Sequence, residues 1–114
     1  MKSVSKFRLK NVSLLEEYKK RHDEVWPEML ELMKQSGINN YSIWNTGDEL
    51  IEYFETEDIE KVYSILGSSE VKARWDHYMS DIIEKEGSHG EAVPLTCMFT
   101  FNGIKPQGVG VHSS

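Results

Sequence analysis

Residues 18–27, with the sequence YKKRHDEVWP, gather the side chains of this chain that are best suited to chemistry. Tyr18 and His22 stand four residues apart, so a helix places the phenol and the imidazole on one face. An imidazole with an ordinary pKa of about 6.5 binds and releases a proton close to neutral pH. Aromatic rings beside it stack on a sugar ring, and phenol groups hydrogen-bond its hydroxyls. This stretch therefore holds the groups that can stack on a sugar ring, hydrogen-bond its hydroxyls and move its protons.

The histidine needs further support, because a single histidine on a helix is most often a structural or surface residue. The other three histidines, His77, His89 and His112, make no metal-ligand spacing with His22, and the chain has a single cysteine. We therefore predict neither a metal nor any other cofactor.

Three motifs supply that support. They are Y-x-x-R-H-x-x-x-W-P at 18–27, Asn-Tyr-Ser-Ile at 40–43 and Arg-Trp-x-x-Tyr-Met at 74–79. In this order and spacing they resemble the L-rhamnose mutarotase family, and the resemblance spans roughly residues 5–102. The resemblance implies an isomerase of carbohydrate and rhamnose metabolism, which interconverts the α and β anomers of L-rhamnose or a related 6-deoxy or L-sugar.

The resemblance also gives each matched residue an expected role. His22 lies at the family's proton-donor position, and Tyr18 and Tyr41 match its sugar-binding tyrosines. Without the resemblance, each tyrosine would be expected to be half-buried with its hydroxyl at the surface. Trp75 is expected to stack against the apolar face of the sugar. Trp26, at a helix break, is expected to pack rather than bind.

Position 76 departs from the family pattern, which has two successive tryptophans in the sugar site. Here Asp76 follows Trp75. The carboxylate is compatible with a different sugar, with a bidentate hold on two hydroxyls or with a solvent-facing position. We include Asp76 among the expected substrate-binding residues, and its presence leaves the preferred sugar open.

The expected reaction opens the hemiacetal ring and closes it on the other face. One group protonates the ring oxygen while another takes the proton from the anomeric hydroxyl, and a histidine suits either half. Such assistance accelerates a reaction roughly 10²–10⁴-fold. The sequence leaves open whether His22 is acid, base or both. The second group is a tyrosine, Asp76 or water.

The first elements that position these residues follow from the hydrophobic pattern. Phe7 and Leu9 alternate with charged side chains over residues 5–10, which predicts a strand with one buried face. Ser13 is a predicted helix N-cap, with Glu16 three residues later completing a capping box.

Proline and glycine predict the boundaries that follow. The helix is expected to break near residues 25–26 and to restart at Pro27, which favours the first helical position, and then to end at Gly37. The remaining predicted elements are a hairpin of strands 40–46 and 49–56 around Gly47-Asp48, a helix from Asp58 to Leu66, a helix capped by Ser68 or Ser69 and reaching about Glu84, and a strand over Leu95–Phe101.

This order is β-α-β-β-α-β, the ferredoxin-like arrangement of an α+β fold. We expect residues 1–102 to form a single domain and residues 103–114 to form a flexible tail. Helices on one face of the sheet leave the other face with more apolar surface than a monomer shows to water. A two-fold homodimer that packs sheet on sheet, or exchanges an edge strand, would cover it. The family resemblance implies such a dimeric α+β barrel.

Composition limits the other functions of the chain. The net charge is −6, and the basic cluster Lys19, Lys20 and Arg21 stands beside two acidic residues as a solvated helix face, so we predict no nucleic-acid binding. No apolar run approaches the roughly 20 residues of a membrane helix, so we expect no membrane association. The N-terminus lacks the apolar stretch of a signal peptide, and the lone Cys97, expected to pack within a strand, cannot form an internal disulfide. Both features favour a cytoplasmic protein.

Two other functional classes remain open. A small dimeric α+β-barrel monooxygenase that uses haem or an activated aromatic substrate would also suit one histidine near an aromatic pocket. A non-catalytic sugar-binding module would bind the sugar and leave anomer exchange at its rate in solvent.

Overall fold

A computed structural model describes residues 1–84 and 93–103 of the chain. Residues 104–114 of the predicted tail, together with His89 and His112, lie outside the described residues. The elements in chain order are β1 Lys2–Leu9, the 3-10 helix η1 Val12–Leu14, α1 Leu15–Asp23, α2 Pro27–Ser36, β2 Asn39–Thr46, β3 Glu49–Glu55, α3 Ile59–Gly67, α4 Glu70–Met79, β4 Ile83–Glu84 and β5 Val93–Pro94.

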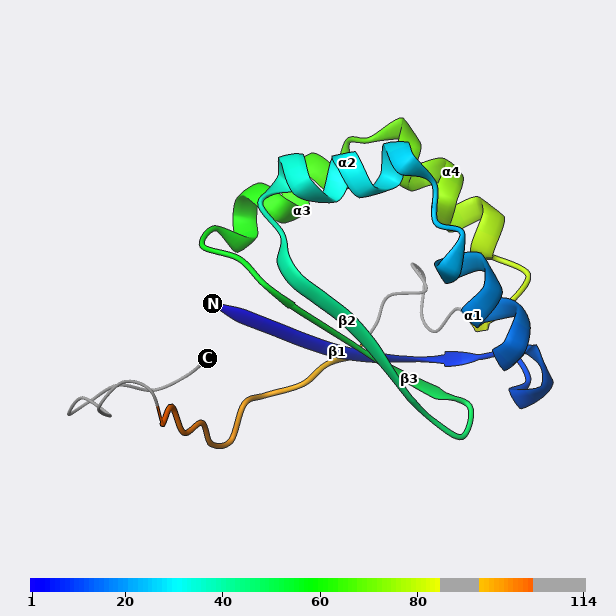
Figure 1. Ribbon diagram of the computed structural model, residues 1–114, viewed down its shortest axis with the longest axis horizontal. Coiled ribbons are helices and arrows are strands. Elements are labelled where there is room, and N and C mark those ends of the chain that lie inside the picture. Colours follow the sequence, from blue (N-terminus) through cyan, green and yellow to red (C-terminus); the bar gives the residue numbers. More distant parts are fainter. Residues whose placement is uncertain (85–92, 104–114) are drawn as a thin grey trace.

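The strands form one antiparallel sheet in the order β2-β3-β1-β4, and β5 also pairs with β1. The four α-helices lie on one side of this sheet, and the segment after β5 leaves on the other side (Figure 1). The structure therefore confirms a mixed α+β fold with an antiparallel sheet. None of the helices among the described residues has the length and apolar character needed to cross a membrane.

The core lies between the sheet and the helices. Leu9 and Leu50 point from β1 and β3 towards the helices and are almost fully buried, because alternate residues of a strand face the same side. They meet Trp75 and Met79 of α4 in one hydrophobic cluster. This cluster fixes how α1 and α4 lie over the sheet, and these two helices carry most of the residues of the predicted site.

The predicted break between the first two helices is confirmed. Trp26 has an extended backbone, with φ −63° and ψ 136°, and Pro27 is the first residue of α2. Gly37 ends α2 in the left-handed region at φ 91°, which a residue without a Cβ adopts at low cost. The Gly47-Asp48 hairpin is also as predicted, and so are the caps Asp58 and Ser69, whose side chains accept from backbone N–H groups of α3 and α4.

The predicted capping box at Ser13 and Glu16 is wrong. The side chain of Asn11 accepts a hydrogen bond from the Ser13 backbone N–H at 2.8 Å, and one 3-10 turn precedes α1. An asparagine side chain bonds readily to a backbone N–H two residues ahead. Asn11 therefore caps the 3-10 turn, and Ser13 lies inside that turn instead of at a helix N-cap.

The end of the predicted 69–84 helix also differs. The helix α4 stops at Met79, Ile82 turns into the core with 1% of its surface exposed, and Ile83–Glu84 form β4 against β1. The helical pattern of the sequence continues past Met79. Burial of Ile82 and the pairing of β4 with Arg8 and Leu9 of β1 stabilise the chain more than continuing the helix would.

The predicted last strand, residues 95–101, is wrong for the described chain. The strand β5 covers Val93–Pro94, and one further bond joins the Leu95 N–H to the Val4 carbonyl. Beyond Leu95, residues 96–103 form no strand, although β4 and β5 pair only with residues 5, 6, 8 and 9 of β1. Cys97, expected to pack within this strand, is exposed.

Candidate functional site

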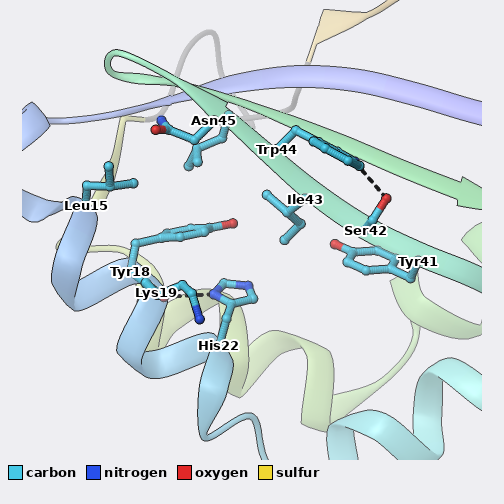
Figure 2. A pocket seen from close by; sticks show the side chains of 10 residues that line it. Leu15, Tyr18, Lys19, His22, Tyr41, Ser42, Ile43, Trp44 and Asn45 are labelled. Atoms are coloured by element: carbon cyan, nitrogen blue, oxygen red, sulfur yellow. Dashed lines mark hydrogen bonds between the residues drawn. The ribbon is translucent and has the colours of Figure 1, made fainter.

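A pocket of about 290 Å³ lies between α1 and the edge strand β2. This volume is close to the lower end of the roughly 300–1,000 Å³ typical of small-molecule sites. The side chains that line it come from α1, β2 and β3 and are shown in Figure 2: Leu15, Tyr18, Lys19, His22, Tyr41, Ser42, Ile43, Trp44, Asn45 and Leu50. Three of the five predicted site residues therefore line one pocket: Tyr18, His22 and Tyr41.

The helix α1 positions Tyr18 and His22 as a stacked pair. Their ring centroids are 4.3 Å apart with 27° between the planes, as expected for residues one helical turn apart. His22 Nδ1 lies 3.1 Å from the Tyr18 carbonyl oxygen. A carbonyl only accepts, so we assign the proton to Nδ1. In the neutral ring Nε2 is then the nitrogen that remains free to exchange a proton with a ligand.

Burial tunes this imidazole. Desolvation lowers the pKa of His22 below its ordinary value, because the charged form loses hydration. The Tyr18 carbonyl and the negative charges of Glu52 and Asp23 act in the opposite direction and only partly offset the effect of burial. Near neutral pH the ring is therefore mainly uncharged, with Nε2 ready to accept a proton.

Tyr41 enters the pocket from β2, on the side opposite α1 (Figure 2). Its ring stacks on Phe54 with 6.3 Å between centroids, and its hydroxyl donates a hydrogen bond to the Glu52 carboxylate. Burial, reinforced by the charge of Glu52, raises the pKa of both Tyr18 and Tyr41 above the ordinary value. Both side chains are therefore neutral hydroxyls at physiological pH and can hydrogen-bond a sugar.

Trp75 lies behind His22 rather than beside the pocket. Only 7% of its surface is exposed, and its ring meets the imidazole edge-on at 5.4 Å. It also meets Trp26 edge-on at 5.2 Å, so Trp26 packs as expected. A tryptophan buried this far has no free face for stacking on a sugar. In this structure Trp75 supports the histidine.

Asp76 is also absent from the pocket wall. It forms an ion pair with Lys72 at 2.5 Å, and 55% of its side chain is exposed. Its charge still reaches the site weakly, since it contributes to the raised pKa of Tyr41. Of the three positions weighed for it, the structure has the solvent-facing one.

The sequence of the chain matches a family model described as L-rhamnose mutarotase over residues 2–101. The chain belongs to the L-rhamnose mutarotase family. An L-rhamnose mutarotase from Listeria monocytogenes is 45% identical over 87 residues, which make up 74% of this chain and 83% of that protein.

Solved structures agree with this membership. The crystal structure of an L-rhamnose mutarotase from Formosa agariphila is similar with a TM-score of 0.75 and 25% identity, and the match covers 90% of this chain and 99% of that one. Tetracenomycin F2 cyclase from Streptomyces glaucescens, at 12% identity and a TM-score of 0.69, shares the fold alone. That match covers 90% of this chain and 98% of the cyclase.

Glu52 is the site residue that sequence reasoning on this mutarotase-family chain missed. It lies on β3 between the buried Leu50 and Phe54, on the face towards the helices. A signal was present in the sequence, since alternation over residues 49–55 predicts a half-buried strand, and Glu52 falls on the same face as Leu50 and Phe54. A carboxylate at such a position calls for a functional explanation.

Metal ligation has no candidate group in the part of the chain that the structure describes. Within residues 1–84 and 93–103, no three His, Cys, Asp or Glu side chains are grouped so that they could hold a metal ion. The polar groups that line the pocket include the His22 imidazole, two tyrosine hydroxyls, the Ser42 hydroxyl and the Lys19 ammonium. The Asn45 amide nitrogen already donates to the Gly47 and Glu49 carbonyls.

Proposed function

We propose that this chain catalyses the interconversion of the α and β anomers of L-rhamnose or a related 6-deoxy or L-sugar. Membership of the L-rhamnose mutarotase family supports the reaction and the sugar class. The observation that carries the chemistry is the free Nε2 of a mainly neutral His22, facing a pocket that is also lined by two tyrosines. The pocket volume of about 290 Å³ suits a monosaccharide.

In this proposal His22 acts first as base and then as acid. Nε2 takes the proton from the anomeric hydroxyl, and the imidazolium returns a proton to the ring oxygen as the bond between C1 and that oxygen breaks. The open-chain aldehyde rotates about its C1–C2 bond. The same steps in reverse close the ring on the other face, so protons balance over the cycle.

The tyrosines bind and orient the sugar. The Tyr18 ring holds the imidazole plane by stacking, and its hydroxyl is directed towards β2 across the pocket (Figure 2). The Tyr41 hydroxyl donates its hydrogen bond to Glu52, so the lone pairs of its oxygen accept from a sugar hydroxyl. Leu15, Ile43 and Leu50 provide apolar contact, which suits the methyl group of a 6-deoxy sugar.

We also propose that the chain is one half of a homodimeric α+β barrel with ferredoxin-like protomers. The sheet face away from the helices carries apolar side chains, including Trp44 with 65% of its surface exposed. The segment after β5 exposes Met98, Phe99 and Phe101 by 71% or more. Apolar area of this extent favours cover by a second copy of the chain.

The dimer is tested by light scattering on the purified chain. We expect twice the chain mass, and a shift towards monomer when Phe99 and Phe101 are both replaced by serine. A wild-type protein that remains monomeric at high concentration would rule the dimer out.

The reaction is tested by proton NMR saturation transfer between the anomers of L-rhamnose, with L-fucose as a second sugar. We expect catalytic amounts of wild-type protein to accelerate exchange over buffer for at least one of them. Exchange at the buffer rate for both sugars, together with demonstrated sugar binding, would favour a non-catalytic binding module.

A further inference from the structure

Glu52 stands on the inner face of a central strand. It pairs across the sheet with Ile43 of β2, which lines the pocket, and with Ser5 of β1. The residues two positions before and after it on the same face, Leu50 and Phe54, are buried. The backbone register therefore carries a carboxylate into the apolar layer that forms the base of the pocket.

The carboxylate has few partners there. It accepts a hydrogen bond from the Tyr41 hydroxyl, and within residues 1–84 and 93–103 no Lys, Arg or His forms an ion pair with it. A half-buried carboxylate without a cation costs free energy, since it loses hydration that one neutral donor replaces only in part. An apolar residue, like its neighbours, would serve packing better.

The negative charge acts on the predicted site residues around the pocket. Glu52 favours the protonated forms of His22, Tyr18 and Tyr41 alike. The other charge that acts on His22 is Asp23 of its own helix, and the charge of Asp76 reaches Tyr41. Of the two charges that act on the imidazole, Glu52 is thus the one that comes from the sheet.

We propose that Glu52 is a positioning residue of the mutarotase site, which holds the Tyr41 hydroxyl in place and balances the positive charge that His22 acquires during turnover. This inference rests on the function proposed above, because it assigns Glu52 a part in the same proton cycle. It is specific to this chain's own carboxylate and its geometry.

The two parts of this role have separate physical causes. An uncharged His22 becomes imidazolium when Nε2 takes the anomeric proton, and a nearby carboxylate lowers the free energy of that state by Coulomb attraction. The hydrogen bond with Tyr41 fixes which lone pairs of the phenol oxygen face the sugar. The first part acts on kcat and the second on binding.

Glu52→Gln and Tyr41→Phe separate the two parts. Glutamine keeps the size and the acceptor oxygen for Tyr41 but removes the charge. We expect kcat for L-rhamnose to fall roughly tenfold with KM within about twofold, because a weaker base transfers the proton less well. The acidic limb of the pH profile should move to lower pH. Tyr41→Phe should instead raise KM and leave that limb in place.

The His22 ring signals, followed by NMR against pH in each variant, test the charge effect without any sugar. The midpoint of His22 should fall in Glu52→Gln, while Glu52→Asp, which keeps a charge, should restore it in part. An unchanged midpoint in Glu52→Gln overturns the inference, and so does wild-type kcat in that variant.

The outcomes also separate this inference from the function on which it rests. If wild-type protein exchanges no sugar anomers, the proposed function fails, and the His22 titration still decides whether Glu52 balances its charge. If wild-type protein is active and Glu52→Gln equals it in kcat and pH profile, the inference about Glu52 alone fails. A circular dichroism spectrum of each variant confirms that the fold is retained.

Discussion

The helices α1 and α4 both carry residues of the family motifs, but they present them in opposite ways. Tyr18 and His22 of α1 line the pocket, whereas Trp75 of α4 is buried behind the imidazole and Asp76 is paired with Lys72 at the surface. A motif on a helix therefore tells which residues share a face. The neighbouring elements decide whether that face looks into a cavity, a core or solvent.

The two helices also differ in their role at the site. In the proposed function the residues of α1 contact the sugar, and Trp75 of α4 supports His22 from behind. Trp75 contacts both His22 and Trp26 edge-on and belongs to the core cluster, so it links the imidazole to the core. Changes in α1 should act mainly on catalysis, and changes in α4 mainly on stability.

The largest effect is expected for His22→Ala. Loss of the proton-transfer group should reduce anomer exchange by roughly 10²–10⁴-fold, measured by saturation transfer. His77→Ala is the matched control, because His77 lies on α4 with an exposed side chain and should leave exchange unchanged. A His22→Ala protein with near wild-type exchange would show that α1 does not carry the proton-transfer group.

Trp75→Ala should lower the free energy of unfolding by about 3–5 kcal/mol, as for a large aromatic removed from a core. Denaturant unfolding measures this loss. Trp75→Phe, which keeps an aromatic edge near His22, should lose less stability and retain more activity. A Trp75→Phe protein with full stability but no sugar binding would instead place Trp75 in the sugar site.

The pH dependence of catalysis should follow the protonation of His22 on α1. Because burial lowers the pKa of His22, kcat/KM should rise with pH through a midpoint below about 6.5 and then level off. Stability should change with pH in the same direction, because the unfolded chain binds the His22 proton more readily than the folded one. The free energy of unfolding therefore falls as the pH falls through this range. A kcat/KM profile that falls with rising pH through this range would show that the charged imidazole is the active form.

The smallest effect is expected for Asp76→Asn. An exposed ion pair contributes roughly 0–1 kcal/mol, so stability and exchange should both stay close to wild type. Lys72→Gln, which removes the same pair from the other end, is the control. If Asp76→Asn alone changes the preference between L-rhamnose and L-fucose, Asp76 contacts the sugar in the working enzyme.

Much of the fold could be predicted because its signals are local. Pro27, Gly37 and the Gly47-Asp48 turn restrict the backbone directly, and each boundary they predicted is present. The cap at Ser13 was mistaken because Asn11, two residues earlier, competes for the same N–H group. The strand expected at 95–101 failed because a strand exists only where its backbone pairs with another strand, and a local pattern does not report whether that pairing forms.

For the site, the sequence determined which chemistry is available, because the spacing of Tyr18 and His22 fixes their common helix face. It also determined the family, through motifs that lie far apart in the chain. Only the tertiary structure decided that Tyr41 meets this pair across the pocket, that Trp75 supports it from behind and that Glu52 lies beneath it. These relations depend on strand register and on how the helices pack over the sheet, and both are set by contacts between residues distant in sequence.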